Sequence, residues 1–390
     1  MDSSSRSAPY RDLLMGTVVL AAAATLLHWP KESISSVQEG LSLCGNILIP
    51  SLFPFFVLSN LVVELGISRY LGKWMAPLMQ PIFHLSGHCS CALILGFIGG
   101  YPIGARTAIS LYQNGQCSKT ECERLLAFCN NSGPAFIFGV VGAGIFQNTS
   151  IGLLLYLTHI AASLLVGFLF RFYKYTHIPP SSKSNWNIQA VPFSTAFTRS
   201  ITNSLTSVLN ICAFVLFFTV FLRCLFLSGI LPFLTHILST LLTPVGLSSR
   251  LIQSLITGMI ELSSGISALT QTGSLSVQIP LAAFMLGWAG FSVHSQVVSF
   301  LSQCDLSPKT YLTGKLLHGI FSAILTQAAL NHLPISQNCF TQKSVSGASI
   351  NFFTSLSHAL LYTLGACSLF FFLTIYAAKK RCGKERRCAL

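Results

Sequence analysis

Three clusters of glycine, proline and polar residues lie inside apolar stretches of this chain, and their residue types could bind a small solute. The first cluster is Gly96-Phe-Ile-Gly99-Gly100-Tyr101-Pro102-Ile-Gly104-Ala-Arg106-Thr107. Four glycines and a proline within nine residues cannot form an unbroken helix, because glycine adds backbone freedom and proline removes an amide donor. We therefore expect the break at Gly99-Gly100-Tyr101-Pro102 to leave backbone groups free for a ligand or an ion.

Arg106 follows this break directly, and two interpretations of it remain open. A charged side chain within hydrocarbon is costly unless it faces a cavity, an acidic partner or the membrane interface. Arg106 is therefore either a residue of a binding site or a side chain that reaches the lipid headgroups from a kinked helix.

The second cluster consists of two amides and a hydroxyl beside another glycine–proline break. It has the sequence Ala127-Phe-Cys-Asn130-Asn131-Ser132-Gly133-Pro134. Asparagine side chains both donate and accept hydrogen bonds, which suits neutral polar groups such as nucleobase edges or sugar hydroxyls. The alternative is that Asn130, Asn131 and Ser132 hydrogen-bond neighbouring helices, a common use of these residues in membranes.

The third cluster, Gly258-Met-Ile-Glu261-Leu-Ser263-Ser264-Gly265, contains an acid well inside an apolar run. An ionisable residue within a membrane is a functional hypothesis by default. Arg106 is the first ion-pair partner to consider for Glu261. The alternative to a functional role for Glu261 is that such a pair is purely structural. His294 lies in the segment of the second half that corresponds to Asn130. The candidate solute-binding residues are therefore Gly99, Gly100, Tyr101, Pro102, Arg106, Asn130, Asn131, Ser132, Glu261, Ser263, Ser264 and His294.

Other residues that could do chemistry give weaker signals. His159 and His318 lie in apolar segments and could ligate a metal or relay protons, but a packing histidine bonded to a neighbour is the commoner case. His88-Cys89-Ser-Cys91 is one short cluster without a second, so we expect no metal site and no cofactor. The sequence lacks HExxH, P-loop and GxSxG motifs and has few acids, so we expect no catalytic residues and no enzyme.

The composition shows where these clusters must operate. Of 390 residues, 52% are hydrophobic and only 8% are charged, and the mean hydropathy is +0.66. Soluble proteins contain about a quarter charged residues, so the composition predicts an all-α polytopic membrane protein in contact with the lipid bilayer. The net charge of +13 is scattered between apolar runs, which indicates a topology signal and not a nucleic-acid surface.

Apolar runs predict nine to ten membrane spans. They lie at 13–29, 41–66, 90–112, 126–146, 151–173, 205–229, 251–272, 279–301, 310–332 and 355–378. Shorter amphipathic segments at 69–86 and 231–245 are predicted to be re-entrant or interfacial helices. The first run follows two arginines and could be a cleaved signal peptide, but it continues past its alanines, so we expect an uncleaved span.

Basic segments predict the topology. Arg6 and Arg11 precede the first run, a Pro- and Ser-rich basic segment covers Lys174 to Arg199, and a basic tail covers Lys379 to Arg387. The positive-inside rule places all three in the cytoplasm, so both termini are expected there. We interpret the tail as a topology anchor, with recognition of anionic lipid as the alternative.

The two halves of the chain have similar patterns. Gly66 and Pro81 match Gly229 and Pro244 at the same offset, and later pairs such as His159 and His318 keep nearly that spacing. We expect a duplication, as in transporters whose two halves surround a site near the bilayer midplane. The predicted parts are a helix and loop at 1–40, a first repeat at 41–173, a linker at 174–200, a second repeat at 201–332, and a final helix with tail at 333–390.

Three segments closely resemble the YlbJ family of sporulation integral membrane proteins: SLFPFFVLS at 51–59, GFIGGYPIGART at 96–107 and LLAFCNNSGPAFIFGVVG at 125–142. The resemblance is dense from 41 to 170 and looser to about 330. It implies a nucleoside recognition or gate domain, also found in the spore maturation proteins SpmA and SpmB, with related segments in concentrative nucleoside transporters. It implies an endospore-forming bacterium and a mother-cell or forespore membrane. The second half carries ELSSG and LGWAG in place of GGYP and NNSGP, so a symmetric site is not expected.

These observations favour a transporter-like protein of sporulation, with two gate-like repeats, in the bacterial inner membrane. It would bind or move a small polar solute, with nucleoside-like solutes the suggestion of the resemblance, and would couple to protons through Glu261 or a histidine, or to sodium through carbonyls. The alternative is a non-transporting scaffold for spore cortex or coat assembly. Both hypotheses leave open whether the protein forms a homo-oligomer.

Overall fold

The fold is described from a computed structural model, which describes residues 8–65, 67–174, 192–243 and 246–332. The chain divides into the units Met1–Ile335 and Ser336–Leu390. The second unit, with the predicted last span and basic tail, lies outside the described residues. Every regular element in the described part is a helix, which confirms the all-α class.

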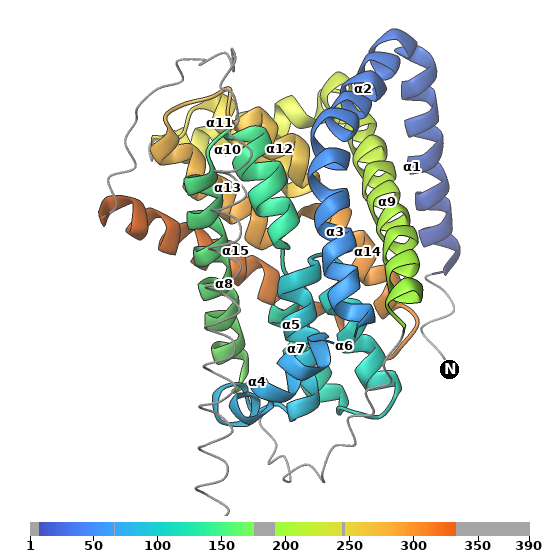
Figure 1. The fold of residues 1–390 in the computed structure, drawn as a ribbon. Coiled ribbons are helices and arrows are strands. Elements are labelled where there is room, and N and C mark those ends of the chain that lie inside the picture. Colours follow the sequence, from blue (N-terminus) through green and yellow to red (C-terminus); the bar gives the residue numbers. More distant parts are fainter. Residues whose placement is uncertain (1–7, 66, 175–191, 244–245, 333–390) are drawn as a thin grey trace, which may run out of the picture. The chain divides into compact units, whose positions relative to one another are not determined.

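The helices of the first half are bounded as follows (Figure 1): α1 Ala8–His28, α2 Pro30–Leu43, η1 Cys44–Leu48, α3 Ile49–Glu64, α4 Ile67–Phe83, η2 Gly87–Cys89, α5 Ser90–Gly99, α6 Ile103–Gln113, α7 Lys119–Cys129, η3 Ala135–Ile145 and α8 Thr149–Phe170. Those of the second half are α9 Phe193–Leu227, α10 Ile230–Leu242, α11 Ser249–Ile260, α12 Leu262–Leu269, α13 Leu275–Trp288, α14 Gly290–Leu301 and α15 Pro308–His332. η1 and η3 are π-helices, and η2 is a 3₁₀ turn.

Four helices of the described chain are long and apolar enough to cross a membrane: Pro30–Val62, Thr149–Phe170, Phe193–Leu227 and Leu275–Leu301. The number of candidate spans in the described chain rises to five if Lys73–Phe83 and Gly87–Gly99, which are bent by 116° at a short break, form one span. This is fewer than the nine to ten spans predicted. The apolar runs at 90–112, 126–146 and 251–272 each split into two short helices, because the glycine, proline and acidic clusters interrupt them.

Two predicted boundaries are wrong. The loop expected before residue 41 is helical, because Pro30 stands at the start of α2, where its fixed φ suits a helix and its missing amide is not needed. The linker expected up to residue 200 ends earlier, because α9 begins at Phe193. The short helices α4 and α10 do lie where the two amphipathic segments predicted them.

Helix α15 lies at the centre of the packing. It contacts α13, α8 and α7, while α3 packs along α9, and α2 packs along the other end of α9 (Figure 1). The apolar core includes every residue of α7 from Leu125 to Cys129, together with Tyr311 of α15. The broken helices are therefore held between the long helices α8, α9 and α15.

The same order of elements occurs twice along the described chain. A long helix, a short amphipathic helix, a broken pair, a second broken pair and a long helix follow one another from α3 to α8 and again from α9 to α15. This order agrees with the matched glycines and prolines of the sequence. The duplication itself stays a prediction.

Candidate functional site

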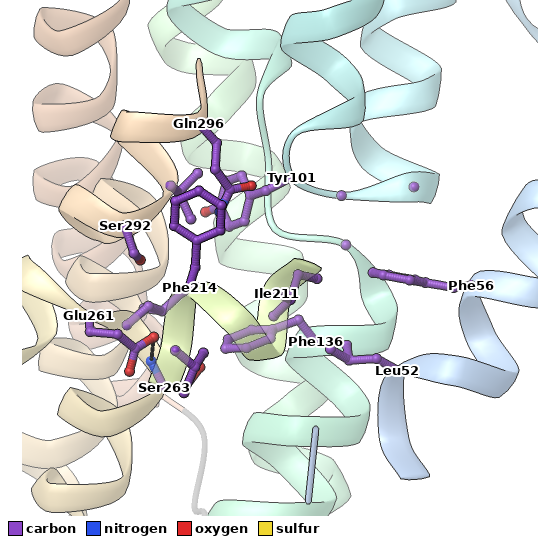
Figure 2. A pocket seen from close by; sticks show the side chains of 16 residues that line it. Leu52, Phe56, Tyr101, Phe136, Ile211, Phe214, Glu261, Ser263, Ser292 and Gln296 are labelled. Carbon is purple, nitrogen blue, oxygen red and sulfur yellow. Dashed lines mark hydrogen bonds between the residues drawn. The ribbon is translucent and has the colours of Figure 1, made fainter. Parts of the chain in front are cut away.

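Breaks from distant parts of the chain meet at one cavity. Its wall contains Gly99, Gly100 and Tyr101 from the α5–α6 break, Gly133 from the α7–η3 break, and Glu261 and Ser263 from the α11–α12 break (Figure 2). Helix α14 adds Ser292 and Gln296, and α3 and α9 complete the wall. The empty volume is about 570 Å³, part of it open to the outside.

Close backbone contacts explain the glycines of the first break. A Cβ at Gly96 or Gly104 would overlap the carbonyl oxygen of Cys129, at the end of α7. Gly100 has a φ of +74°, a conformation that favours glycine, and its Cα lies against Gly133 of the next break. The α5–α6 and α7–η3 breaks are therefore packed backbone to backbone.

Glu261 caps the second half of its own broken helix. Its carboxylate accepts hydrogen bonds from the backbone amides of Ser263 (3.0 Å) and Ser264 (2.6 Å) at the start of α12. The side chain is 2% exposed and lines the cavity (Figure 2). An anion at a helix N-terminus is stabilised by the helix dipole and the unpaired amides. Two hydrogen bonds leave lone pairs on the carboxylate for a solute donor.

The polar cluster of the α7–η3 break is fully buried. Asn131 Nδ2 donates to the Phe128 carbonyl (2.9 Å), and the Ser132 amide donates to His159 Nε2 (3.0 Å). Asn130 Nδ2 donates to the hydroxyl of Tyr311 (3.3 Å). The side-chain oxygens of Asn130 and Asn131 are buried with no hydrogen-bond partner in the described structure. Neither asparagine is among the residues that line the cavity.

The remaining candidates lie in different surroundings. His294 Nδ1 shares a hydrogen bond of 3.0 Å with the Tyr311 hydroxyl, so it adjoins the Asn130 cluster. Pro102 precedes α6 directly. Arg106 is exposed, and no ion pair joins it to Glu261 in the described residues, so the expected Arg106–Glu261 pair is wrong. Arg106 lies on the exposed face of α6, while Glu261 is hydrogen-bonded to the amides at the start of α12.

The histidines of the two halves pack together as expected of packing histidines. His318 Nε2 donates to the carbonyl oxygen of His159 over 3.0 Å, and their ring centroids are 4.2 Å apart. Each ring therefore has one nitrogen hydrogen-bonded to the protein: Nε2 of His318 to the His159 carbonyl, and Nε2 of His159 to the Ser132 amide. Within the described residues, no group of three or more His, Cys, Asp or Glu side chains could hold a metal ion.

Sequence reasoning missed two sets of residues. Phe56, Phe136 and Phe214 supply aromatic walls to the cavity from α3, η3 and α9 (Figure 2). No sequence signal distinguishes these phenylalanines from others in apolar helices. Lys315 of α15 is fully buried beside the Asn130 cluster. Its signal is a lysine between apolar residues in Thr-Gly-Lys-Leu-Leu-His, within a predicted span.

A second cavity lies on the other side of the α11–α12 pair. It is lined by Thr257 of α11, Ser264 of α12, Gln271 beyond the end of α12, Glu39 of α2 and Arg223 of α9. Its empty volume is about 910 Å³, part of it open to the outside. Ser264 thus faces away from the first cavity. The α11–α12 break therefore contributes to a largely apolar cavity and to a second cavity whose lining is both polar and apolar.

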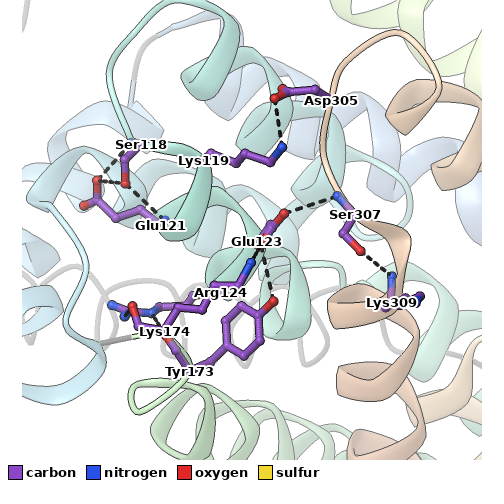
Figure 3. Close-up of polar contacts among 10 residues, drawn as sticks. All are labelled: Ser118, Lys119, Glu121, Glu123, Arg124, Tyr173, Lys174, Asp305, Ser307 and Lys309. Carbon is purple, nitrogen blue, oxygen red and sulfur yellow. Dashed lines mark hydrogen bonds and ion pairs between the residues drawn. The ribbon is translucent and has the colours of Figure 1, made fainter. Parts of the chain in front are cut away.

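A polar cluster on α7 holds several helix ends together. Glu121 accepts from the amide and hydroxyl of Ser118, as a capping box, and from the Ser86 amide (2.8 Å). Glu123 accepts from the Ser307 amide (3.3 Å) at the start of α15 and lies 3.5 Å from Lys174 Nζ (Figure 3). These acids fix the ends of the broken helices and do not line the cavity.

The chain resembles known proteins in sequence and in fold. Residues 47–174 match the family model described as Gate: Nucleoside recognition. The sporulation integral membrane protein YlbJ of Bacillus subtilis (strain 168) is 31% identical, over 96% of this chain and 98% of that protein. The structure of CNTnw in an inward-facing substrate-bound state matches with a TM-score of 0.54 at 14% identity, over 84% of this chain and 87% of that one. A CNTnw variant in the intermediate 3 state gives 0.55 at 14% identity, over 86% and 88%.

Proposed function

The chain belongs to the YlbJ family of sporulation integral membrane proteins, and from this premise we propose that it binds a small polar solute and moves it across the membrane. One observation carries the proposal: the α5–α6, α7–η3 and α11–α12 breaks meet at one cavity, with Glu261 in its wall. Transporters commonly build their sites at the midplane from broken helices, because freed backbone groups are tolerated only where they line a cavity.

The wall of the cavity indicates the class of solute. Phe136, Phe214 and Tyr101 offer apolar and aromatic faces to a flat ring, and Glu261, Ser263 and Gln296 offer groups for hydroxyl or amide hydrogens. A nucleoside-like solute combines these features. The description of the family model that matches 47–174 supports the same class.

The second cavity supports movement of the solute and not binding alone. Glu261 and Ser263 line the first cavity, and the adjacent Ser264 lines the second cavity together with Gln271. A displacement of the short α11–α12 pair would connect the two cavities. We place the protein in the inner membrane of the mother cell or forespore, with the basic segments before the first span and at 174–199 in the cytoplasm.

Thermal unfolding of the purified protein with a panel of solutes tests the proposal. The panel contains nucleosides, amino acids and dipicolinate at matched ionic strength. A solute that binds only the folded state raises the melting temperature in a saturable manner. We expect the shift from a nucleoside-like compound to be lost in Glu261→Gln and kept in Glu32→Gln, an acid that lines neither cavity.

The alternative is the scaffold of spore cortex or coat assembly, which the name of the relative leaves open. Spore formation by the same two variants separates the candidates. A transporter requires Glu261, so Glu261→Gln should reduce heat-resistant spores while the protein reaches normal levels in the membrane. Normal sporulation of Glu261→Gln, together with no thermal shift from any solute, would favour the scaffold.

A further inference from the structure

Lys315 of α15 is fully buried and contacts the α7–η3 break from behind the cavity. Its Nζ donates to the carbonyl oxygen of Asn130 (3.0 Å) and to Nδ1 of His318 (3.3 Å). The same Nζ lies 5.2 Å from the centroid of the Tyr101 ring, close enough for a cation–π contact. An ammonium has three N–H donors, and two acceptors and one aromatic face are arranged around it.

Nothing negatively charged balances Lys315 locally. The described ion pairs are Lys119–Asp305, Lys174–Glu123 and Arg199–Glu64, and none includes Lys315. A buried cation without an acid is rare in membranes and marks an ion or solute pathway when it occurs. Packing alone does not require a lysine at this position, since an apolar side chain could fill the same space.

The neighbouring histidines act as neutral acceptors. His318 donates its Nε2 hydrogen to the His159 carbonyl, which leaves Nδ1 to accept from Lys315. His159 Nε2 accepts from the Ser132 amide. The hydrogen bonds therefore assign both rings to the neutral form, in which one nitrogen donates and the other accepts.

The partner of Lys315 is a carbonyl at a helix end. Helix α7 ends at Cys129, so the carbonyls at its end lack helical partners and carry the negative end of the helix dipole. The buried side-chain oxygens of Asn130 and Asn131 lie at the same break without hydrogen-bond partners in the described structure. Carbonyls of broken helices and half-helix C-termini are the groups that coordinate a coupling cation in transporters.

We propose that the ammonium of Lys315 is a tethered cation that fills a monovalent-cation site at the α7–η3 break. The chain supplies from α15 the positive charge that a free cation would otherwise bring to the Asn130 carbonyl oxygen. Where the proposed solute binding holds, it follows that binding needs no metal cation. The occupied cation site itself does not depend on that function.

Removal of the tethered charge tests the proposal. Lys315→Ala should lower the melting temperature by several degrees, because it leaves the Asn130 carbonyl oxygen without a cation. Ethylammonium or Na⁺ should restore stability in a saturable manner, compared with N-methylglucamine, which is too large for the space, at equal ionic strength. Lys309→Ala removes an exposed lysine of the same helix and should show neither the loss nor the rescue.

Two outcomes would overturn the proposal. In one, Lys315→Met is as stable as the parent and Lys315→Ala gains nothing from any cation, which makes the lysine a space-filling residue. In the other, the parent protein itself gains stability from Na⁺ relative to N-methylglucamine. The Na⁺ measurement on the parent needs no variant, so the proposal can be tested even if Lys315→Ala does not fold. Neither measurement includes a solute, so failure here is distinct from failure of solute binding.

Discussion

Arg124 Nε donates a hydrogen bond of 2.6 Å to the carbonyl oxygen of Tyr173, which lies beyond the end of α8. The same guanidinium donates to the carbonyl oxygens of Lys174 (2.6 Å) and His84 (3.1 Å). Arg124 is 1% exposed, and Figure 3 shows its side chain beside Tyr173 and Lys174. A single side chain of α7 therefore holds the ends of α4 and α8, and its planar group suits several acceptors at once.

Replacement of Arg124 by methionine should destabilise the fold strongly. The change removes three charge-assisted hydrogen bonds and leaves their carbonyl acceptors in the interior, so we expect a loss of about 3 to 5 kcal/mol of unfolding free energy. Arg124→Lys should recover only part of it, because an ammonium lacks the fork geometry. Chemical unfolding in detergent measures both.

Arg199→Met is the matched control for Arg124. Arg199 is 60% exposed and lies 3.9 Å from Glu64, so its ion pair contributes little. A stability of Arg124→Met equal to that of this control would contradict the role of Arg124 in holding the helix ends.

Gly104→Ala should force the α5–α6 break away from the α7–η3 break and destabilise the fold. Its Cβ would overlap the Cys129 carbonyl, and that oxygen belongs to a helix end that cannot move independently. We expect a loss of more than about 2 kcal/mol, as for overpacking of a tight core. Gly45→Ala, where a Cβ would meet nothing within 4 Å, should be neutral or slightly stabilising. Thermal unfolding compares them, and equal effects would show that the close approach is not required.

His159→Leu should destabilise the α7–η3 break. The leucine fills similar space but leaves the Ser132 amide buried without its acceptor, which costs about 1 to 3 kcal/mol. Hydrogen exchange at residues 130–133 should become faster, because the amide is no longer held. His332→Leu, at the exposed end of α15, serves as the control. Unchanged exchange in His159→Leu would refute the role of His159 in holding this break.

Asp305 gives a pH-dependent prediction outside the membrane-spanning helices. The hydrogen bond from Lys119 (2.8 Å), and next that from Tyr112, hold the pKa of Asp305 below its usual range. Because the pKa is lower in the folded state, the stabilisation is present above the unfolded pKa of about 4 and is lost as the pH falls through the folded value.

The parent should therefore lose more thermal stability than Asp305→Asn between about pH 6 and pH 3. The effect should be small and should shrink in high salt, because both side chains are exposed. Glu39→Gln, an exposed acid outside this ion pair, should lose stability as the parent does. If Asp305→Asn loses as much stability as the parent, the pair does not contribute.

The positions of the helix breaks were predictable from the sequence, but the residues that each break contacts in the folded protein were not. Glycine and proline act on the local backbone, so GGYP and NNSGP predicted the α5–α6 and α7–η3 breaks. The α13–α14 break at Ala289, with a φ of +82°, carries no proline and was not predicted. Arg106 was assigned to the site because it follows a break, but its side chain lies on the exposed face of α6.

The sequence by itself determined the membrane class, the helical fold and the positions of most interruptions, because hydropathy and backbone chemistry depend on short segments. Only the tertiary structure decided which interruptions share a cavity and which charged residues are buried. Lys309 and Lys315 are both lysines of α15, yet one is exposed and the other contacts Asn130, far away in the chain. Burial depends on the helices that pack around a residue, and that packing is fixed by contacts across the whole chain.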